Sequence, residues 1–489
     1  MGWSRVFMSG FSMLHRSVFP IALVASLLPV GANAFEIGVS YDSLNDPRTP
    51  IEGLARVYFG RDIGHGISFG QSIYAGAKGD GGGAFFWGVE GVKRFALSDR
   101  LSLNTSLFLG GGGGAAVVVG DGFMTRAGVG LGYALSDRVD AELGASYINI
   151  AGADIENTAL NAGLTWHIGA REGQRALTGS PLSMPLRSVT IRGSYADMGG
   201  SRDRTGAAQA NLKLAGAEAS FLLGGRNELI LSADGAASGG EGYMQIFGGM
   251  RHRIALGQRA SVYGQAALGF GGGGLVDTGG GVLLDAGLGV SVALLPWADL
   301  DLSVGKTIAP DGDMNATVAR VGLTRVFRRS IEAGPVSAAP QRWAYTLGIS
   351  MQDANAAFRK PGATATGNPV MQESSVDLFL NDNIYVTGNA QTALGGDVAG
   401  YAIGMLGLGW HQPISDRWSV SLEGRIGAAG GGGVDVSGGV IGSVAIEADY
   451  ALNDTMSLSV GLGKIKALKG GGMAPTTLTA GLKFPFTTH

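Results

Sequence analysis

Five histidines beyond residue 34 are the residues best suited to acid–base chemistry: His65, His167, His252, His411 and His489. A hydrolytic site of the triad type needs a nucleophile, a histidine base and a carboxylate that orients the base. These histidines lie beside short turns or at strand ends, and none has a serine or carboxylate partner that recurs along the chain. We therefore predict that the protein is not an enzyme and assign no catalytic residue.

Two short motifs suggest phosphate or metal binding but lack required residues. "GKT" at 305–307 ends like a phosphate-binding loop, yet the position of the first glycine is Leu300. "DGDMN" at 311–315 has calcium-loop spacing, but Ala316 replaces the glycine and Gly322 replaces the final glutamate of such a loop. We expect no cofactor and no metal site.

Glycine runs accompany a recurring aspartate. "GGGGLVDTGGG" (271–281) and "GGGGVDVSGG" (430–439) share a Val-Asp pair, which places Asp277 and Asp435 in equivalent positions, with Asp121 loosely matching. One hypothesis is a functional rim whose aspartates bind a partner or a cation. The alternative is structural, because glycine runs also suit extended loops and places where backbones approach closely.

A long internal repeat positions these motifs. The phrases "GLTWHI" (163–168), "GLTRVF" (322–327) and "GLKFPF" (481–486) begin at glycines that are separated by 159 residues, and then by 159 again. Similar opening strands, glycine runs and turn phrases such as "ALSDR" and "PISDR" recur between them. Equal spacing over such a length indicates a unit that occurs three times.

The residues between turns alternate with a period of two. In 456–463, Met456, Leu458, Val460 and Leu462 alternate with serines and glycines. An apolar face opposite a small or polar face, over about ten residues between turns, is typical of a transmembrane barrel strand. Eight such strands are expected in the first copy, and the same number in the others. We predict an all-β, transmembrane outer-membrane β-barrel fold made of three eight-stranded antiparallel repeats.

Composition agrees with an exported membrane protein. The 489 residues include 86 glycines and no cysteine, with a formal net charge of −3, which gives no sign of nucleic-acid binding. Residues 1–34 resemble a secretory signal peptide, with a short apolar segment before "ANA". We predict cleavage there and localisation in the outer membrane.

The last strand carries a resemblance to a known family. "GLKFPF" resembles the C-terminal β-signal of Gram-negative outer-membrane proteins, and the matching positions are Gly481, Leu482, Phe484 and Phe486. This resemblance implies recognition by the outer-membrane assembly machinery, with the apolar side chains directed at lipid. Eight strands with minimal loops are also similar to the small barrels of the OmpA and OmpX type.

Two architectures fit the repeat: three barrels in tandem, or one barrel of about 24 strands. The proline-bearing junctions favour tandem barrels, since a hairpin needs only two to five residues. The expected division is a signal peptide (1–34), repeat 1 (35–168), a linker (169–188), repeat 2 (189–327), a linker (328–343) and repeat 3 (344–489).

The sequence leaves three functions open. The first is a non-catalytic channel or export component that works with envelope partners. The second is a structural or surface-binding barrel that presents its glycine-rich loops. A lipid-modifying enzyme is the third and weakest hypothesis. The expected partners are outer-membrane lipid, the assembly machinery and an envelope or export partner.

Overall fold

The computed structural model describes residues 34–44, 49–115, 118, 120–153, 155–169, 185–240, 242–330, 336, 340–355, 357–363 and 367–488. The expected signal peptide therefore lies outside the described residues, apart from Ala34. The central parts of both expected linkers also lie outside them. Strand structure replaces the ends of these linkers, because β9 begins at Leu186 and β17 begins at Gln341.

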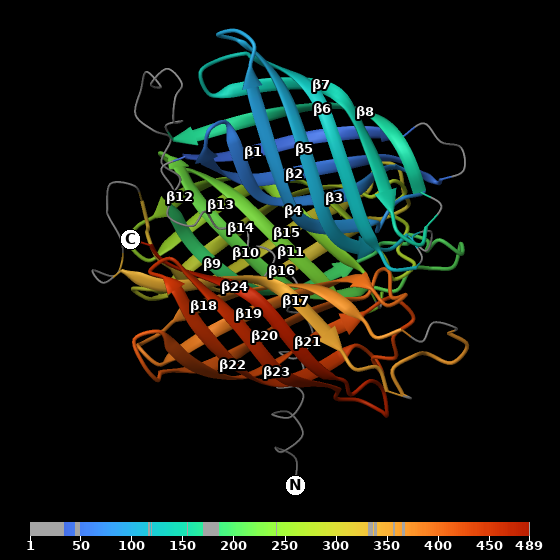
Figure 1. The fold of residues 1–489 in the computed structure, drawn as a ribbon, viewed down its shortest axis with the longest axis vertical. Coiled ribbons are helices and arrows are strands. Elements are labelled where there is room, and N and C mark those ends of the chain that lie inside the picture. Colours follow the sequence, from blue (N-terminus) through green and yellow to red (C-terminus); the bar gives the residue numbers. More distant parts are fainter. Residues whose placement is uncertain are drawn as a thin grey trace.

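Twenty-four strands form three groups of eight (Figure 1). Barrel 1 contains β1 (Ala34–Leu44), β2 (Ile51–Gly64), β3 (Ile67–Gly79), β4 (Phe85–Ala96), β5 (Leu101–Gly113), β6 (Phe123–Ala134), β7 (Val139–Ile150) and β8 (Ile155–Gly169). Barrel 2 contains β9 (Leu186–Asp197), β10 (Leu212–Gly224), β11 (Asn227–Ser238), β12 (Met244–Leu256), β13 (Ala260–Gly272), β14 (Val282–Leu295), β15 (Ala298–Ile308) and β16 (Asn315–Val326). Barrel 3 contains β17 (Gln341–Gln352), β18 (Val370–Phe379), β19 (Ile384–Gly395), β20 (Ala402–Pro413), β21 (Trp418–Gly430), β22 (Val440–Asn453), β23 (Met456–Ala467) and β24 (Thr476–Thr488).

Each group closes on itself. The first strand pairs antiparallel with the last strand of its own group: β1 with β8, β9 with β16, and β17 with β24. Closure gives every edge strand a partner, which a bilayer requires because its interior offers no water to unpaired backbone groups. The prediction of three eight-stranded repeats is confirmed, and the single barrel of about 24 strands is excluded.

Short turns join the strands at one end of each barrel. In the "ALSDR" and "PISDR" turns, Ser98, Ser136 and Ser415 each accept hydrogen bonds from backbone amides two and three residues later. A serine that caps a turn in this way explains why the phrase recurs. The longer loops lie at the opposite end, together with the glycine runs. Among the described residues, no helix has the length and hydropathy needed to cross a membrane.

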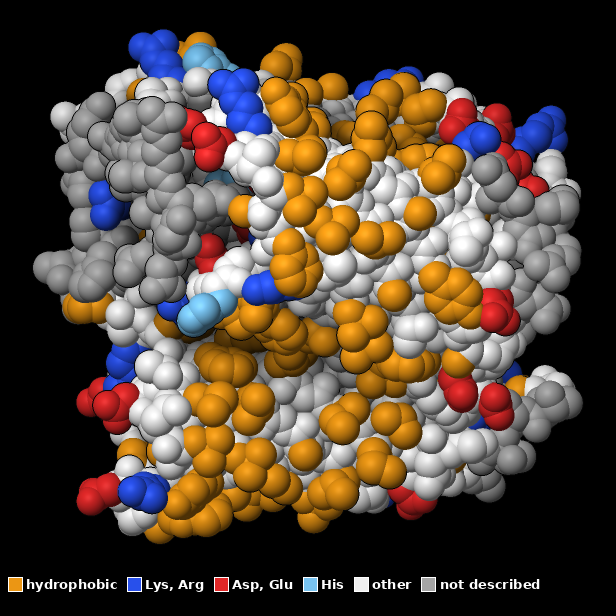
Figure 2. Space-filling model, turned by 45° about the horizontal axis from the view of Figure 1, so that its top comes forward, with side chains coloured by type: hydrophobic (Ala, Val, Ile, Leu, Met, Phe, Trp, Pro, Cys, Tyr) orange, Lys and Arg blue, Asp and Glu red, His pale blue; other side chains and the backbone are white. Residues whose placement is uncertain are grey.

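The predicted alternation sets the two faces of the barrel wall. On β15, Leu302 is 44% exposed on the outer face, whereas Asp299 is buried inside the barrel. On β23, Leu458, Val460 and Leu462 are exposed, and Ser459 is buried between them. Figure 2 shows apolar side chains over the strands and charged side chains gathered at the two edges of this face. That distribution suits a lipid-facing band between two polar rims.

The three barrels pack side by side around a shared apolar cluster. Outward-facing side chains of all three barrels meet there, so they contact protein where an isolated barrel would contact lipid. The buried members are Phe59, Ile73, Phe85 and Trp87 of barrel 1, Ala219, Phe221 and Ala233 of barrel 2, and Trp343, Val376 and Ala390 of barrel 3.

Polar side chains also occur on outer faces at this junction. Gln71 of barrel 1 is only 7% exposed, and its amide donates to the phenol oxygen of Tyr345 in barrel 3. Trp87 Nε1 donates to Gln71 Oε1 at 3.2 Å, and Ser374 Oγ donates to the Tyr345 oxygen at 2.9 Å. These bonds satisfy polar groups at membrane depth, where unpaired ones are costly.

The glycine runs mark the places where neighbouring barrels touch through their backbones. A Cβ on Gly272 of barrel 2 would lie 2.3 Å from the amide nitrogen of Gly83 in barrel 1. A Cβ on Gly113 of barrel 1 would lie 2.3 Å from the amide nitrogen of Gly400 in barrel 3. The third contact, between barrels 3 and 2, is looser, with 3.9 Å between a Gly430 Cβ and Gly242 Cα.

The same two segments of each barrel make these contacts at all three junctions. In each, the last residue of the fifth strand of one barrel meets the loop between the third and fourth strands of the next. An arrangement that repeats head to tail and closes after three units is a cyclic one. The glycine runs are therefore places of close backbone approach between barrels.

Four tryptophans form an exposed belt, and a fifth lies elsewhere. Trp166, Trp297, Trp410 and Trp418 are exposed near the short-turn ends of their strands, as an interfacial belt requires. Trp343, in contrast, is 5% exposed and packs in the central cluster against Phe327 and Phe486. Its position at the start of barrel 3 turns it toward barrel 2 instead of lipid.

Candidate functional site

The lumen of barrel 2 holds the largest group of buried charges. Arg192 on β9 donates through Nε and Nη2 to the two carboxylate oxygens of Asp234, at 2.9 and 2.7 Å. Its Nη1 donates to Glu218 at 2.8 Å. This bidentate geometry is the strongest form of arginine–carboxylate pairing. The alternation of the strands places all three side chains on the inner face, although they come from different strands.

A second arginine extends this network across the lumen. Arg251 on β12 pairs with Glu218 at 2.7 Å and donates to Gln265 Oε1 at 2.6 Å. Its guanidinium also lies 4.3 Å from the ring centre of Tyr263, a cation–π distance. Arg253 contacts the same ring from 4.9 Å and pairs with Glu228. The side chains therefore fill the cross-section of the barrel.

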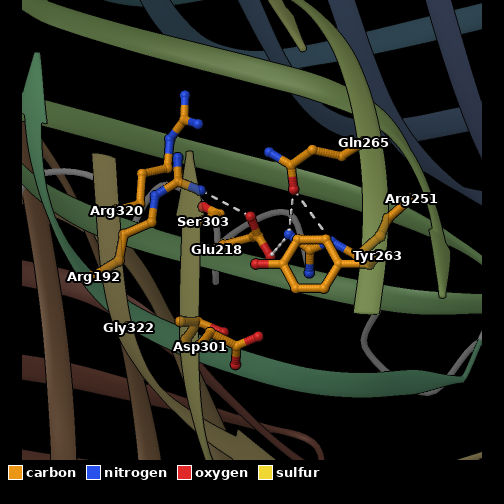
Figure 3. A pocket seen from close by; sticks show the side chains of 10 residues that line it. Arg192, Glu218, Arg251, Tyr263, Gln265, Asp301, Ser303, Arg320 and Gly322 are labelled. Carbon is orange, nitrogen blue, oxygen red and sulfur yellow. Dashed lines mark hydrogen bonds and ion pairs between the residues drawn. The ribbon is translucent and has the colours of Figure 1, made fainter. Parts of the chain in front are cut away.

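A small cavity remains inside this network (Figure 3). Its volume is about 20 Å³, which suffices for one or two water molecules. Arg320 Nη1 and Asp301 Oδ1 both border the cavity, and neither atom has a hydrogen-bond partner among the described residues. An unpaired donor and an unpaired acceptor facing the same cavity suit a bridging water. The cavity is too small for an organic substrate.

Barrel 1 has a comparable interior. Arg56 pairs with Glu90 at 2.8 Å, and Arg126 pairs with Asp42 at 2.8 Å. Near the short-turn end, His167 lies 2.8 Å from Asp140. The inner faces of these strands thus carry compensating charges in place of an open passage.

Barrel 3 differs in its balance of charge. Among the described residues, its buried acids, which include Glu447 and Asp449, outnumber the basic residues of the lumen, buried Arg425 and partly buried Lys483. Lys483 pairs with Asp449 at 2.8 Å and with Glu447 at 3.4 Å. Within the part of the chain that the structure describes, no group of three His, Asp or Glu side chains could hold a metal ion.

Apolar side chains close the opposite end of every lumen, where the longer loops lie. The loop after the fifth strand turns a valine inward in each barrel, and this valine packs with strand and loop residues. The inserted valines and two neighbours each are Val118, Phe108 and Ile148 in barrel 1; Val276, Tyr243 and Met314 in barrel 2; and Val434, Tyr401 and Met473 in barrel 3. We call each cluster an apolar plug. It explains the valine of the repeated Val-Asp pair.

The predicted rim aspartates order the same loops. Asp121 Oδ1 accepts hydrogen bonds from the amides of Gly396 and Asp397 in barrel 3, at 2.8 and 3.0 Å. Asp277 and Asp435 accept from amides of their own loops, Gly279 at 3.0 Å and Ser437 at 2.9 Å. Each carboxylate therefore has backbone partners. Asp121 contacts a neighbouring barrel, and the other two cap their own turns.

The longest loop of barrel 2, between β9 and β10, also has an aspartate that accepts hydrogen bonds from its own loop, and it folds over the mouth of the barrel. Asp203 pairs with Val276 in an isolated bridge and accepts hydrogen bonds from Thr205 and Ala207. The hydrogen bond from the Thr205 hydroxyl, followed by those from backbone amides, holds the pKa of the Asp203 carboxyl below its usual value. Arg204 donates to the carbonyl oxygen of Gly82 in barrel 1 at 3.0 Å, so this loop also links two barrels.

The histidines do not assemble a reactive site among the described residues. His411 Nδ1 lies 3.2 Å from Ser421 Oγ, which is a nucleophile–base pair by distance. Ser421 is buried inside barrel 3, however, so no substrate could reach its oxygen. His65 lies in a short turn, His252 lies on β12 and contacts Asn227, and His489 lies outside the described residues.

Closed antiparallel barrels with apolar outer faces and polar interiors are the architecture of outer-membrane barrels. This chain has the fold of a Gram-negative outer-membrane β-barrel protein. The final strand, β24, contains the predicted β-signal. In β24, Leu482 is exposed on the outer face, but Phe486 is partly buried and stacks 6.1 Å from Trp343, so only part of the predicted β-signal faces lipid.

Several solved outer-membrane structures are similar to this barrel protein. They include the siderophore receptor PirA from Acinetobacter baumannii, with 11% identity and a TM-score of 0.29 over 94% of this chain and 81% of that one. OpdQ from Pseudomonas aeruginosa matches with 10% identity and a TM-score of 0.21 over 93% and 96% of the two chains. The copper transporter OprC matches with 12% identity and a TM-score of 0.31 over 94% and 81%. No protein-family model and no curated protein matches the chain. Values this low carry no argument about the activity of this barrel protein.

Sequence reasoning missed the polar residues of the inter-barrel junction. Gln71 stands at an outward position of β3, between the apolar Phe69 and Ile73. Gln372 and Ser374 break the outward pattern of β18 in the same way, and both are buried. A polar side chain at the centre of an otherwise apolar outer face is the signal that could have revealed a protein contact.

Proposed function

We propose that this protein is a non-catalytic outer-membrane platform, a structural or surface-binding assembly of three barrels that presents short glycine-rich loops outside the cell. The observation that carries this proposal is the filling of the lumens. Ion-pair networks occupy their middle, and apolar plugs close their external ends. Eight-stranded barrels are narrow enough for side chains to fill.

The filled lumens favour this function over a channel. Passage of a hydrated solute through barrel 2 would require both the plug around Val276 and the pairs of Arg192 and Arg251 to open together. Buried ion pairs resist such opening, since separating one partner exposes an uncompensated charge. In the part of the chain that the structure describes, the serine of the His411–Ser421 pair is buried and inaccessible, which favours a non-enzymatic role.

The orientation follows from the loops. We infer that residues 1–34 direct export and are removed, and that the assembly machinery recognises the final strand. The short turns, and the residues at which the chain enters and leaves each barrel, would then lie on the periplasmic side. The glycine runs and the apolar plugs would lie on the outer surface, where an envelope or extracellular partner could reach them.

Electrical recording on the full-length mature protein tests the closed-lumen proposal. In planar bilayers we expect no stepwise conductance, even though the inserted protein is folded and heat-modifiable on gels. Regular single-channel steps that scale with protein added would overturn the proposal and favour the channel. A known porin reconstituted in the same bilayers serves as the control for detection.

Single-cysteine labelling tests the orientation, because the natural chain contains no cysteine. Asp311→Cys places a thiol in an exposed long loop, and Asp416→Cys places one in an exposed short turn. A membrane-impermeant maleimide should label the first variant on intact cells. It should label the second only after the outer membrane is permeabilised, and the reverse pattern would contradict the assignment.

A further inference from the structure

The outer face of β23 changes from apolar to cationic toward its long-loop end. Leu458, Val460 and Leu462 are exposed and apolar, and the next two outward positions are Lys464 and Lys466. Ile465 is buried inside the barrel, next to the plug residues, which confirms that both lysines point outward. The strand lies on the side of barrel 3 remote from barrels 1 and 2 (Figure 1).

These lysines have no acidic neighbours on the outer face. Lys464 lies between Val444 of β22 and Thr476 of β24, and Lys466 lies beside Gly442. Among the residues that the structure describes, neither lysine forms an ion pair, and the same is true of exposed Lys469 in the following loop. Barrel 1 shows the contrast, because its outer-rim Lys78 pairs with Glu52 at 2.9 Å.

The position of the lysines suits the boundary between lipid and water. A charge on the lipid-facing side of a barrel is most costly at the bilayer centre and least costly near the head groups. Two lysines at successive outward positions therefore locate the external head-group region at this end of β23. Lys306 of barrel 2 occupies the equivalent position on β15 and is also exposed.

Apolar surface lies directly beside the charges. Leu468 is 50% exposed and reaches over the outer side of Gly442, where a Cβ would lie 3.3 Å from its methyl carbon. Leu462 is exposed one position below Lys464. The surface thus combines two leucines for acyl chains with three ammonium groups for phosphate. We call Lys464, Lys466 and Lys469 the lysine patch.

We propose that the lysine patch binds the phosphorylated glycolipid of the outer leaflet, with its phosphates on the ammonium groups and an acyl chain along Leu462 and Leu468. Charge complementarity carries this choice. Lys464 and Lys466 point outward from the barrel wall, Lys469 is exposed in the following loop, and juxtamembrane lysines gain binding energy from anionic head groups. The proposal rests on the external orientation of the long loops, which the cysteine labelling tests separately.

The test compares lipid retention by the full-length mature protein and a triple variant, Lys464→Gln, Lys466→Gln and Lys469→Gln. Each folded protein is transferred into detergent containing lipid A, and bound lipid is counted by native mass spectrometry. We expect the variant to retain at least about tenfold less lipid A than the natural protein, because three ammonium–phosphate attractions are lost together. Replacement of the same lysines by arginine should preserve retention.

A matched variant removes three exposed arginines from short turns: Arg100→Gln, Arg226→Gln and Arg259→Gln. It should retain lipid A as the natural protein does. Equal retention by the lysine variant and the natural protein would overturn the proposal, and so would equal loss from both triple variants. Displacement of lipid A by millimolar inorganic phosphate would overturn the lipid assignment in favour of free phosphate. Heat-modifiability on gels verifies folding, and Lys466→Gln alone replaces the triple variant if that variant fails to fold.

Discussion

The amide of Gln71, on the outer face of barrel 1, donates a hydrogen bond to the phenol oxygen of Tyr345, on the outer face of barrel 3. The same glutamine accepts from Trp87 Nε1, and the tyrosine accepts from Ser374. Four side chains from two barrels thus satisfy one another inside the apolar junction. In lipid, side chains of this kind act as specific contacts between otherwise similar apolar surfaces.

A double-mutant cycle should reveal this contact. Gln71→Ala and Tyr345→Phe each remove one partner, and we expect a coupling of about 0.6–1.7 kcal/mol in the free energy of unfolding. Urea unfolding in lipid vesicles provides the measurement. Gln71→Ala combined with Tyr147→Phe, whose hydroxyl bonds to Glu156 away from the junction, should be additive. A coupling near zero for the first pair would show that the barrels do not depend on this contact.

Close backbone approach predicts a large effect from one methyl group. Gly272→Ala places a Cβ 2.3 Å from the Gly83 amide nitrogen of the neighbouring barrel. Overpacking of this kind costs about 1–3 kcal/mol. Gly424→Ala is the control, because nothing lies within 4 Å of its Cβ. The temperature at which each variant loses its folded gel band should fall only for Gly272→Ala, and equal values would refute the proposed contact.

The lipid-facing side of β15 predicts a penalty for charge. Leu302→Arg should lower the free energy of unfolding in vesicles by about 2–4 kcal/mol, whereas Leu302→Phe should be tolerated. Ser303→Arg, on the inner face, would be mild in a hydrated lumen. The structure changes that expectation, because Ser303 borders the cavity of about 20 Å³ together with Arg192, Arg251 and Arg320. Ser303→Arg should therefore also be destabilising. If Leu302→Arg proved harmless, β15 would not face lipid.

Buried and exposed ion pairs should differ in their contributions. Arg192→Ala leaves buried Asp234 without its ion-pair partner and leaves Glu218 with Arg251 alone, which should cost about 3–5 kcal/mol. Arg342→Ala breaks the exposed pair with Asp382, a change of about 0–1 kcal/mol. Unfolding in urea measures both. A similar small effect for both variants would contradict the filled lumen.

Closure within each repeat predicts that barrel 3 folds alone. A fragment of residues 340–489 behind a signal peptide contains β17 to β24 and every closing pair, so it should give a compact, heat-modifiable band. It must begin at 340 rather than 344, because Gln341 to Trp343 pair with the end of β24. It should be less stable than the full chain, since Gln372 and Ser374 would then face lipid. Consistent aggregation of the fragment would show that the barrels fold only together.

The sequence alone determined the local structure of this protein. Alternation such as Leu458–Ser459–Val460 sets which side chain faces lipid, and capping serines such as Ser98 set the turns. Both signals act over a few residues, so they can be seen in the primary structure. The spacing of the three "GL" phrases indicated three copies, and the resemblance of the last strand indicated the outer membrane.

Only the tertiary structure decided how the copies close and what their interiors contain. The alternation on β8 is the same whether its partner is β1 or β9, so pairing across more than 100 residues selects three barrels. Pairs such as Arg126 with Asp42 join different strands of one lumen, and contacts such as Gly272 with Gly83 join different barrels. These long-range contacts depend on the curvature of each closed sheet and on the packing of one barrel against another. A local sequence pattern contains neither.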